Sequence, residues 1–218
     1  MARTARTSHP KATVTSVPRS WPGETAIIIA TGPSLTAEDV DFCRGKGRVI
    51  AVNDAYKLAP WADALYATDA RWWHWHEGVP SFTGPKWSME HSAWGTHRAL
   101  YPDIQRLRNT GPSGLEHAPT GLKNGRNSGF AAVNLAVHYG ATRIVLLGFD
   151  MQAVKGRSHF FGEHPNRQKS PYNQFRQRFE SLVKPLRKVG VSVVNCSRNS
   201  LLECFPKADL RQTLSVAA

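Results

Sequence analysis

Cysteine and long apolar runs are both scarce in this sequence. Its three cysteines, Cys43, Cys196 and Cys204, are odd in number and widely spaced, with no C-x2-C pair. This excludes a disulfide framework and a cysteine-paired zinc site, and it fits a reducing cytoplasm. The longest apolar run, residues 26–30, is only as long as a strand, so no membrane span is expected. The basic N-terminus lacks the apolar stretch of a secretory signal. We therefore expect a cytoplasmic protein.

Acidic residues are also few. The 218-residue chain has 28 Lys and Arg against 16 Asp and Glu, a formal net charge of +12. Such an excess indicates a polyanionic partner, either nucleic acid or a phosphate-rich ligand, and charge alone does not choose between them. Hydrophobic residues make up 41% and charged residues 20% of the chain. These values are typical of a globular protein and exclude collagen, a coiled coil and a fully disordered chain.

The composition changes along the chain in a way that suggests its organisation. Residues 1–23 are basic, contain no acid and show no apolar period, so we expect a flexible basic arm. Residues 24–210 are expected to form one nucleotide-binding transferase domain, followed by a tail at 211–218. Within the domain, residues 71–120 are rich in Trp and His, and we interpret them as a lid or insertion with one possible strand near residues 86–89.

Short buried strands alternate with helices through the rest of the chain. Continuous apolar runs, typical of strands buried on both faces, occupy residues 25–30, 48–52, 64–67, 143–148 and 191–195. Helical spacing predicts helices over residues 35–43, 128–139 and 172–189. This alternation predicts an α/β, Rossmann-like, mostly parallel sheet with helices on both faces and a Trp/His-rich lid insertion.

The first strand ends in the turn Thr31-Gly32-Pro33-Ser34. Gly32 allows close approach of a ligand to the backbone, and a following helix N-terminus with the Ser34 hydroxyl favours phosphate. The turn matches neither the dinucleotide-binding glycine motif nor the P-loop. A turn that serves only chain reversal remains the alternative.

Polar residues follow other predicted strands and one predicted helix start. Asn53 and Asp69 follow the second and third strands, where amide and carboxylate groups could contact a base and a ribose. Asp69 could equally form a structural ion pair with Arg71. The segment Asn127-Ser128-Gly129 could cap its helix, hold a diphosphate, or do both.

The polar loop after the strand at 143–148 carries two histidines. His159 and His164 are candidate general bases because the ordinary pKa of histidine lies near neutrality, and Glu163 could orient a histidine or act itself. Asp150 could supply a third ligand for a metal, but cationic neighbours favour an anionic ligand instead. Those neighbours include Lys155 and Arg157.

The tryptophans of residues 71–120 admit two interpretations. They could stack on bases or sugars, or they could form a satellite core beneath a long loop. We favour the core for most of them and expect Trp72 and Trp73, which follow Asp69, to be the exceptions.

In chain order, these segments read strand–GPSL, strand–N, NSGFAAVNLAVHYGATRIVLLGFD, SHFFGEH and CSRNSLLECF. The set resembles the bacterial sialyltransferases that use CMP-activated sugars, together with the related pterin pyrophosphokinase-like and phage-encoded proteins. The similarity covers roughly residues 25–210, excluding most of the Trp/His-rich segment. It implies a nucleotide-binding α/β domain, a transferred sugar, no metal and no permanently bound cofactor.

The resemblance also implies roles for individual residues. The turn Gly32-Pro33-Ser34, Asn53, and the pair Ser128-Gly129 would lie near the nucleotide donor, as would the late segment Asn199-Ser200. His164 would be the general base, although Glu163 lengthens the spacing by one residue. Gln152 stands where the sialyltransferases have a tyrosine that assists the departing phosphate, so Lys155 or Arg157 is expected to replace that tyrosine.

The sequence therefore predicts a metal-independent glycosyltransferase that uses a nucleotide-sugar donor. Its net charge suggests DNA as acceptor, through a hydroxymethylated base in phage DNA, which would place the protein in a host cytoplasm. One alternative is pyrophosphoryl transfer from ATP, with Mg²⁺ on Asp150 or Asp69. Another is a non-catalytic nucleic-acid-binding accessory protein.

Overall fold

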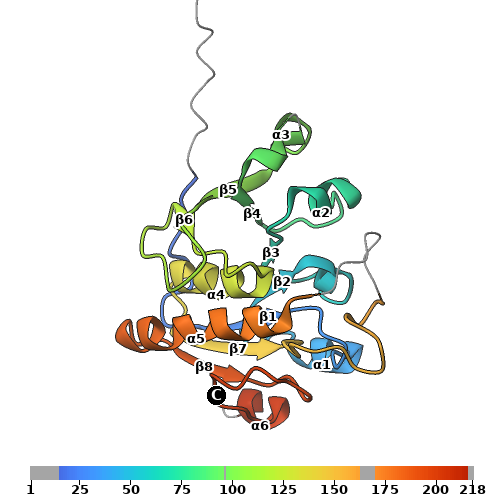
Figure 1. The fold of residues 1–218 in the computed structure, drawn as a ribbon, viewed down its shortest axis with the longest axis vertical. Coiled ribbons are helices and arrows are strands. Elements are labelled where there is room, and N and C mark those ends of the chain that lie inside the picture. The colour runs from blue at the N-terminus through green and yellow to red at the C-terminus, as the bar shows by residue number, and fades with distance from the viewer. Residues whose placement is uncertain (1–14, 96, 163–169, 216–218) are drawn as a thin grey trace, which may run out of the picture.

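A single eight-stranded sheet organises the chain (Figure 1). The computed structural model describes residues 15–95, 97–162 and 170–215. The strand order is β6-β5-β4-β3-β2-β1-β7-β8, and every neighbouring pair is parallel. The strands are β1 Thr25–Ile29, β2 Arg48–Val52, β3 Ala64–Tyr66, β4 Lys86–Glu90, β5 Ile104–Asn109, β6 Gly121–Leu122, β7 Arg143–Leu147 and β8 Ser192–Asn195. The predicted α/β class with a parallel sheet is confirmed.

Helices connect the strands and cover both faces of the sheet. They are α1 Ala37–Phe42, α2 Ala70–Trp75, α3 His97–Leu100, α4 Ser128–Tyr139, α5 Tyr172–Lys188 and α6 Leu210–Ser215, with 3-10 turns η1 Asn53–Lys57 and η2 Ser92–Trp94. Side chains alternate across β1, so Ala26 and Ile28 pack in the cluster that contains α4 and α5. Ile27 and Ile29 pack in the opposite cluster, with α1 and α6. This two-sided burial explains the continuous apolar run of β1.

Local signals fix the ends of α4. The Asn127 side chain accepts a hydrogen bond from the Phe130 N–H at 3.1 Å, so it is the N-cap. At the other end Gly140 adopts the left-handed conformation, with φ 102°. The helix therefore spans the predicted residues. Its buried Asn134 is satisfied by the backbone of Glu116 and Lys123, and in this way α4 anchors the loop before β6.

The sequence analysis predicted that residues 71–120 form a lid or insertion outside the regular sheet. This prediction was wrong. These residues supply α2, η2, α3 and two full strands, β4 and β5, and the chain then enters β6. The expected strand near residues 86–89 is confirmed as β4. Strand β5 escaped detection because only Ile104 and Leu107 of its six residues are buried, and polar side chains separate them. This segment thus builds one side of the main sheet.

Two further predictions about the ends of the chain need correction. Residues 15–23 are not a flexible arm, since Val17 and Trp21 are each only 4% exposed and the Trp21 ring stacks on Tyr139 at 3.8 Å. Val17 and Trp21 form no periodic apolar pattern, so their burial could not be predicted from the sequence. The remainder of the predicted arm, residues 1–14, lies outside the described residues. In the predicted tail, residues up to Ser215 belong to α6, and Leu214 is buried.

Candidate functional site

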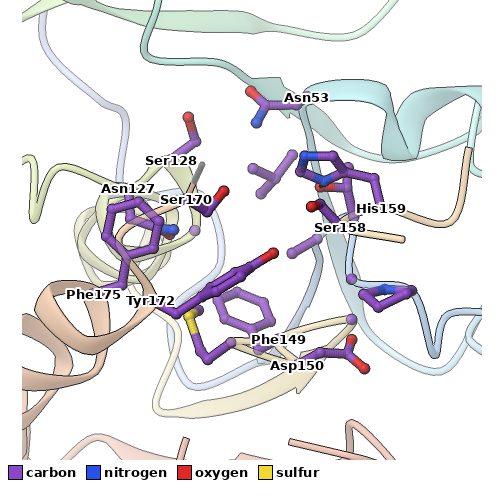
Figure 2. Close-up of a pocket in the computed structure, with 18 of the residues that line it drawn as sticks. Asn53, Asn127, Ser128, Phe149, Asp150, Ser158, His159, Ser170, Tyr172 and Phe175 are labelled. Atoms are coloured by element: carbon purple, nitrogen blue, oxygen red, sulfur yellow. The ribbon is translucent and has the colours of Figure 1, made fainter. Parts of the chain in front are cut away.

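A pocket opens at the carboxyl ends of the central strands (Figure 2). The strand order reverses between β1 and β7, and ligands of open parallel sheets bind at such a reversal. The pocket is lined from β1, β2, β7, the start of α4 and the start of α5. The lining residues are Ala30, Thr31, Gly32, Pro33, Val52, Asn53, Asn127, Ser128, Gly129, Gly148, Phe149, Asp150, Met151, Gln152, Ser158, His159, Ser170, Tyr172 and Phe175.

The turn after β1 lies against the end of β7. The Gly32 N–H donates to the Gly148 carbonyl at 2.8 Å. A Cβ atom at position 32 would lie 1.8 Å from Asp150 Oδ2 and 2.5 Å from that carbonyl oxygen. Only glycine fits here, because the turn packs against the protein's own β7 end. The predicted approach of a ligand to the Gly32 backbone stays a prediction.

Asp150 lies at the end of β7 and is 1% exposed. Its Oδ1 accepts the Ser34 N–H at 3.2 Å, while its Oδ2 has no hydrogen-bond partner among the described residues. Burial raises the pKa of this carboxyl, and the opposing effect of the Ser34 hydrogen bonds does not offset it. Asp150 therefore joins the β1 turn to the end of β7, and its second oxygen is buried without a hydrogen-bond partner among the described residues.

Asn53 begins η1 in the left-handed conformation, with φ 51°. This conformation is uncommon outside glycine, but asparagine tolerates it best among the other residues. The backbone turn lets the Asn53 side chain line the pocket (Figure 2). The structure thus brings Asn53 to the same cavity as Gly32, as the sequence predicted.

The N-terminus of α4 forms another part of the wall. Since Asn127 caps the Phe130 N–H and Ala131 bonds to the Asn127 carbonyl, the N–H groups of Ser128 and Gly129 are left without an intrahelical acceptor. Gly129 packs so closely that a Cβ there would lie 2.6 Å from the Phe149 ring. Capping and ligand binding are compatible here, and the helix dipole adds a preference for an anion.

His159 lies across the pocket from α4 (Figure 2). Its Nδ1 is 3.0 Å from the Thr31 hydroxyl, and the Phe160 N–H donates to the Thr31 carbonyl at 3.0 Å. The imidazole also stacks on Phe161, with ring centroids 5.0 Å apart. These contacts hold the histidine loop over the β1 turn. The other two catalytic candidates, Glu163 and His164, lie outside the described residues.

Asp69 does not line the pocket. It caps α2 by accepting the Arg71 N–H at 2.9 Å and pairs with the Arg71 guanidinium at 2.7 Å. Burial acts to raise the pKa of the Asp69 carboxyl, but the bonds from Arg71 outweigh it and the pKa is lowered. Asp69 and Arg71 therefore form a structural ion pair, which is the alternative that the sequence analysis had left open.

Lys155 and Arg157 are exposed and do not line the pocket either. They belong to a tight turn closed by backbone hydrogen bonds between Val154 and Arg157, in which Lys155 has φ 49°. The structure therefore gives no support to their predicted contact with a departing phosphate.

The Asn199-Ser200 segment supports the pocket from outside. The Ser200 hydroxyl is buried, donates to the Phe149 carbonyl at 2.6 Å and accepts from the Asn195 amide at 2.8 Å. The Asn199 carbonyl accepts a hydrogen bond from the Gln152 side-chain amide. Both residues thus hold the end of β7 in place, which is a positioning role that sequence spacing alone could not reveal.

Trp72 and Trp73 are core residues. They are 3% and 0% exposed, and their indole N–H groups donate to Asp54 at 2.8 Å and to the Ala67 carbonyl at 3.0 Å. The expectation that these two tryptophans are exceptions to the core interpretation was wrong.

Sequence reasoning missed the contribution of α5. Tyr172 and Phe175 line the pocket from its first turn, and Ser170 precedes them. The amphipathic pattern predicted only which residues of α5 face the core. Nothing in the sequence indicated that the start of α5 lies beside the β1–β7 reversal.

The described residues contain no group of three or more His, Cys, Asp or Glu that could hold a metal ion. Over the same part of the chain, no helix is long and apolar enough to cross a membrane.

Neither a protein-family model nor a curated protein matches the sequence. Among solved structures, the sialyltransferase CstII from Campylobacter jejuni, in complex with cytidine-5'-monophosphate, matches with a TM-score of 0.53. The fold is that of a bacterial sialyltransferase. The two chains are 15% identical over 85% of each. A second CstII structure, with CMP-3FNeuAc, has a TM-score of 0.49 at 15% identity over 84% of each chain. The resemblance predicted from the sequence is thus confirmed at the level of the fold.

Proposed function

We propose that this protein is a glycosyltransferase that moves a sugar from a nucleotide donor to an acceptor hydroxyl. The observation that carries the proposal is the pocket at the β1–β7 reversal, where the α4 N-terminus, Asn53 and His159 meet. The shared fold supports it, because the neighbouring structure holds cytidine-5'-monophosphate.

The donor we propose is a sugar linked to a nucleoside monophosphate. The described lining includes one carboxyl, Asp150, and no lysine or arginine. A single phosphate needs only neutral donors and the helix dipole, whereas a diphosphate beside a buried carboxyl would need a compensating cation. The N–H groups of Ser128 and Gly129 would hold the phosphate, with Asn53 on the nucleoside side.

In the reaction, the acceptor O–H loses its proton to a histidine as its oxygen bonds to the sugar carbon. The bond from that carbon to the phosphate oxygen breaks, and the nucleoside monophosphate leaves with the electron pair. By the resemblance the base is His164. Among the described residues, His159 is the histidine that lines the pocket. We propose that no metal is required.

Nucleic acid is the acceptor we propose, through a hydroxylated base. Support comes from the net charge of +12. Phosphate contacts make binding salt-dependent, so duplex DNA should bind much more tightly at about 50 mM than at about 300 mM salt. Equal binding at both concentrations would remove DNA as acceptor.

The function is tested by nucleotide release from CMP-, UDP- and GDP-linked sugars and from ATP, with EDTA or with Mg²⁺. We expect release of CMP that EDTA does not slow. Turnover of ATP that requires Mg²⁺ would instead establish pyrophosphoryl transfer. In parallel, a nucleotide at about 100 times its Kd should stabilise the protein by about 2.7 kcal/mol. If the protein turns over none of these compounds and none of them stabilises it, the non-catalytic alternative is supported.

A further inference from the structure

Three arginines gather around one glutamate at the carboxyl ends of β4 and β5. The Arg98 guanidinium donates a hydrogen bond to Glu90 Oε1, and Arg106 Nε lies 3.7 Å from Glu90 Oε2. Arg108 is the register partner of Glu90 and projects from the same face of β5 as Arg106. This arginine cluster, Arg98, Arg106 and Arg108, therefore has more positive than negative charge.

The fold holds the arginine cluster in place without neutralising it. The Arg106 side chain is only 16% exposed, and its guanidinium lies 5.1 Å from the centroid of the Trp94 ring. Burial and the neighbouring charge of Arg98 lower the pKa of the Arg106 guanidinium. The exposed Arg108 donates to a neutral group, the Thr120 hydroxyl, at 2.7 Å. An anion at this surface would relieve the repulsion that a single glutamate leaves uncompensated.

The arginine cluster lies on the same edge of the sheet as the pocket, because parallel strands share their carboxyl edge. Three strand spacings of about 4.8 Å separate β5 from β2, where Asn53 enters the pocket, which makes roughly 14 Å. Polar contacts span part of this interval. The Ser88 hydroxyl donates to the Thr68 carbonyl, and the Thr68 N–H donates to the Ser128 hydroxyl in the pocket wall, both at 3.3 Å.

Arginine side chains in this arrangement suit a chain of phosphates. The planar guanidinium donates in pairs to phosphate oxygens and is more weakly hydrated than an ammonium group. A strand of duplex DNA has one phosphate per about 3.4 Å of helix axis, so about four nucleotides cover the distance from the pocket to the arginine cluster.

We propose that Arg98, Arg106 and Arg108 bind the phosphate backbone of the nucleic-acid strand whose target base enters the pocket. The arginine cluster is then a binding surface that sets where the acceptor lies and takes no part in the bond-forming step. The inference rests on the proposed function and deepens it, because net charge alone gives the acceptor no place in the fold.

The double variant Arg98→Gln/Arg108→Gln is the test, because glutamine keeps a polar side chain and removes both charges. We expect the Kd for a labelled DNA duplex at about 50 mM salt to rise about tenfold or more, and the slope of log affinity against log salt to become shallower by about 1.8. In transfer to DNA, KM for the DNA should rise while kcat changes little. The Kd for CMP should be unchanged, since neither residue lines the pocket.

The matched control is Arg44→Gln/Arg211→Gln, which removes the same charge elsewhere. These side chains are 61% and 51% exposed, and each is paired with a carboxylate, Asp41 and Glu38 respectively. Arg44 precedes β2 and so lies toward the edge of the sheet opposite the pocket. DNA affinity and its salt slope should stay close to the wild-type values.

If the double variant binds DNA with the wild-type Kd and salt slope, or if the control weakens binding as much, the role of the arginine cluster is overturned and the proposed function stands. Should the double variant fail to fold, Arg108→Gln alone decides, with a slope shallower by about 0.9, because it leaves the Arg98–Glu90 pair intact. If wild type releases CMP from its donor but binds DNA equally at low and high salt, the nucleic-acid acceptor and the arginine cluster fall together and the glycosyltransferase activity stands. DNA binding through the arginine cluster without any nucleotide release would instead overturn the proposed function alone.

Discussion

The two sides of the sheet differ in where their unpartnered buried polar atoms lie relative to the pocket. On the β3–β6 side, most buried indole groups have protein partners: Trp87 donates to the Tyr139 hydroxyl at 2.6 Å and Trp94 to the Met89 carbonyl at 2.9 Å, whereas the indole N–H of Trp61, just before β3, has no partner among the described residues. Beside β1 and β7, Asp150 and Tyr172 each retain a buried polar atom without one. The side rich in Trp and His looked more functional in sequence, yet its two unpartnered atoms, Trp61 Nε1 and Thr110 Oγ1, do not line the pocket. Two unpartnered polar atoms from residues that line one cavity mark the candidate site better than composition does.

The largest effect is expected from Trp94→Ala on the β3–β6 side. The side chain is fully buried, so its removal should cost about 3–5 kcal/mol of unfolding free energy. Denaturant unfolding measures this, and nucleotide affinity of the folded variant should be unchanged. Trp75→Ala is the control, because that side chain is 38% exposed and its loss should cost about 1 kcal/mol or less. A stable Trp94→Ala variant that cannot bind nucleotide would restore a nucleotide-binding role for this side.

Gly32→Ala should have the next largest effect, this time on both stability and binding. The new Cβ would collide with the Asp150 carboxyl and the Gly148 carbonyl, costing about 1–3 kcal/mol and displacing the pocket wall. Melting curves with and without CMP measure both. The control is Gly45→Ala, where no atom lies within 4 Å of the added Cβ. Only the backbone, with φ 71°, is strained there, so the free energy of unfolding should fall by about 1 kcal/mol and CMP binding should be unchanged. Full CMP binding by Gly32→Ala would place the ligand elsewhere.

Asp150→Asn and Asp69→Asn should change stability in opposite directions at neutral pH. The raised pKa of Asp150 means that its ionised form is disfavoured in the folded state, so stability falls as pH rises through the interval above the ordinary carboxyl pKa. Asparagine cannot ionise, so it removes that cost and should raise the free energy of unfolding at neutral pH. The lowered pKa of Asp69 contributes stability that is lost as pH falls through the folded-state pKa. Asp69→Asn should therefore destabilise at neutral pH.

Both differences should disappear in acid, where each carboxyl is protonated in folded and unfolded chains alike. Unfolding measured from neutral pH down to about pH 2 provides the check, because the lowered pKa of Asp69 keeps its carboxyl ionised in the folded chain below the ordinary carboxyl pKa. If both variants change the free energy of unfolding in the same direction, the contrast between an unsatisfied and a paired carboxyl is contradicted.

Elements with local signals were predictable from the sequence. Helix α4 was bounded correctly because Asn127 and Gly140 are caps that act within a few residues. Strands β1, β2 and β7 were found because burial on both faces leaves continuous apolar runs. The turn at Gly32 and the residue Asn53 follow directly from such strands, so their meeting at one edge could be anticipated.

What could not be predicted depends on contacts between distant segments. Strand β6 has two residues and exists only through its pairing with Arg108 and Asn109 of β5. The packing of Trp21 on Tyr139 joins segments more than a hundred residues apart. Tyr172 joins the pocket only because α5 begins beside the β1–β7 reversal. None of these leaves a periodic or local trace in sequence.

The most direct measurement of the central claim is a map of backbone amide chemical shifts during titration of the full chain with CMP. We predict saturable shifts concentrated at the strand-end turns and at the starts of α4 and α5, with the β4–β6 side unaffected. The expected residues are 31–34, 53, 127–130, 148–152, 158–160, 170 and 172–175. Shifts centred on the Trp-rich side, or no saturable shifts at all, would contradict the account.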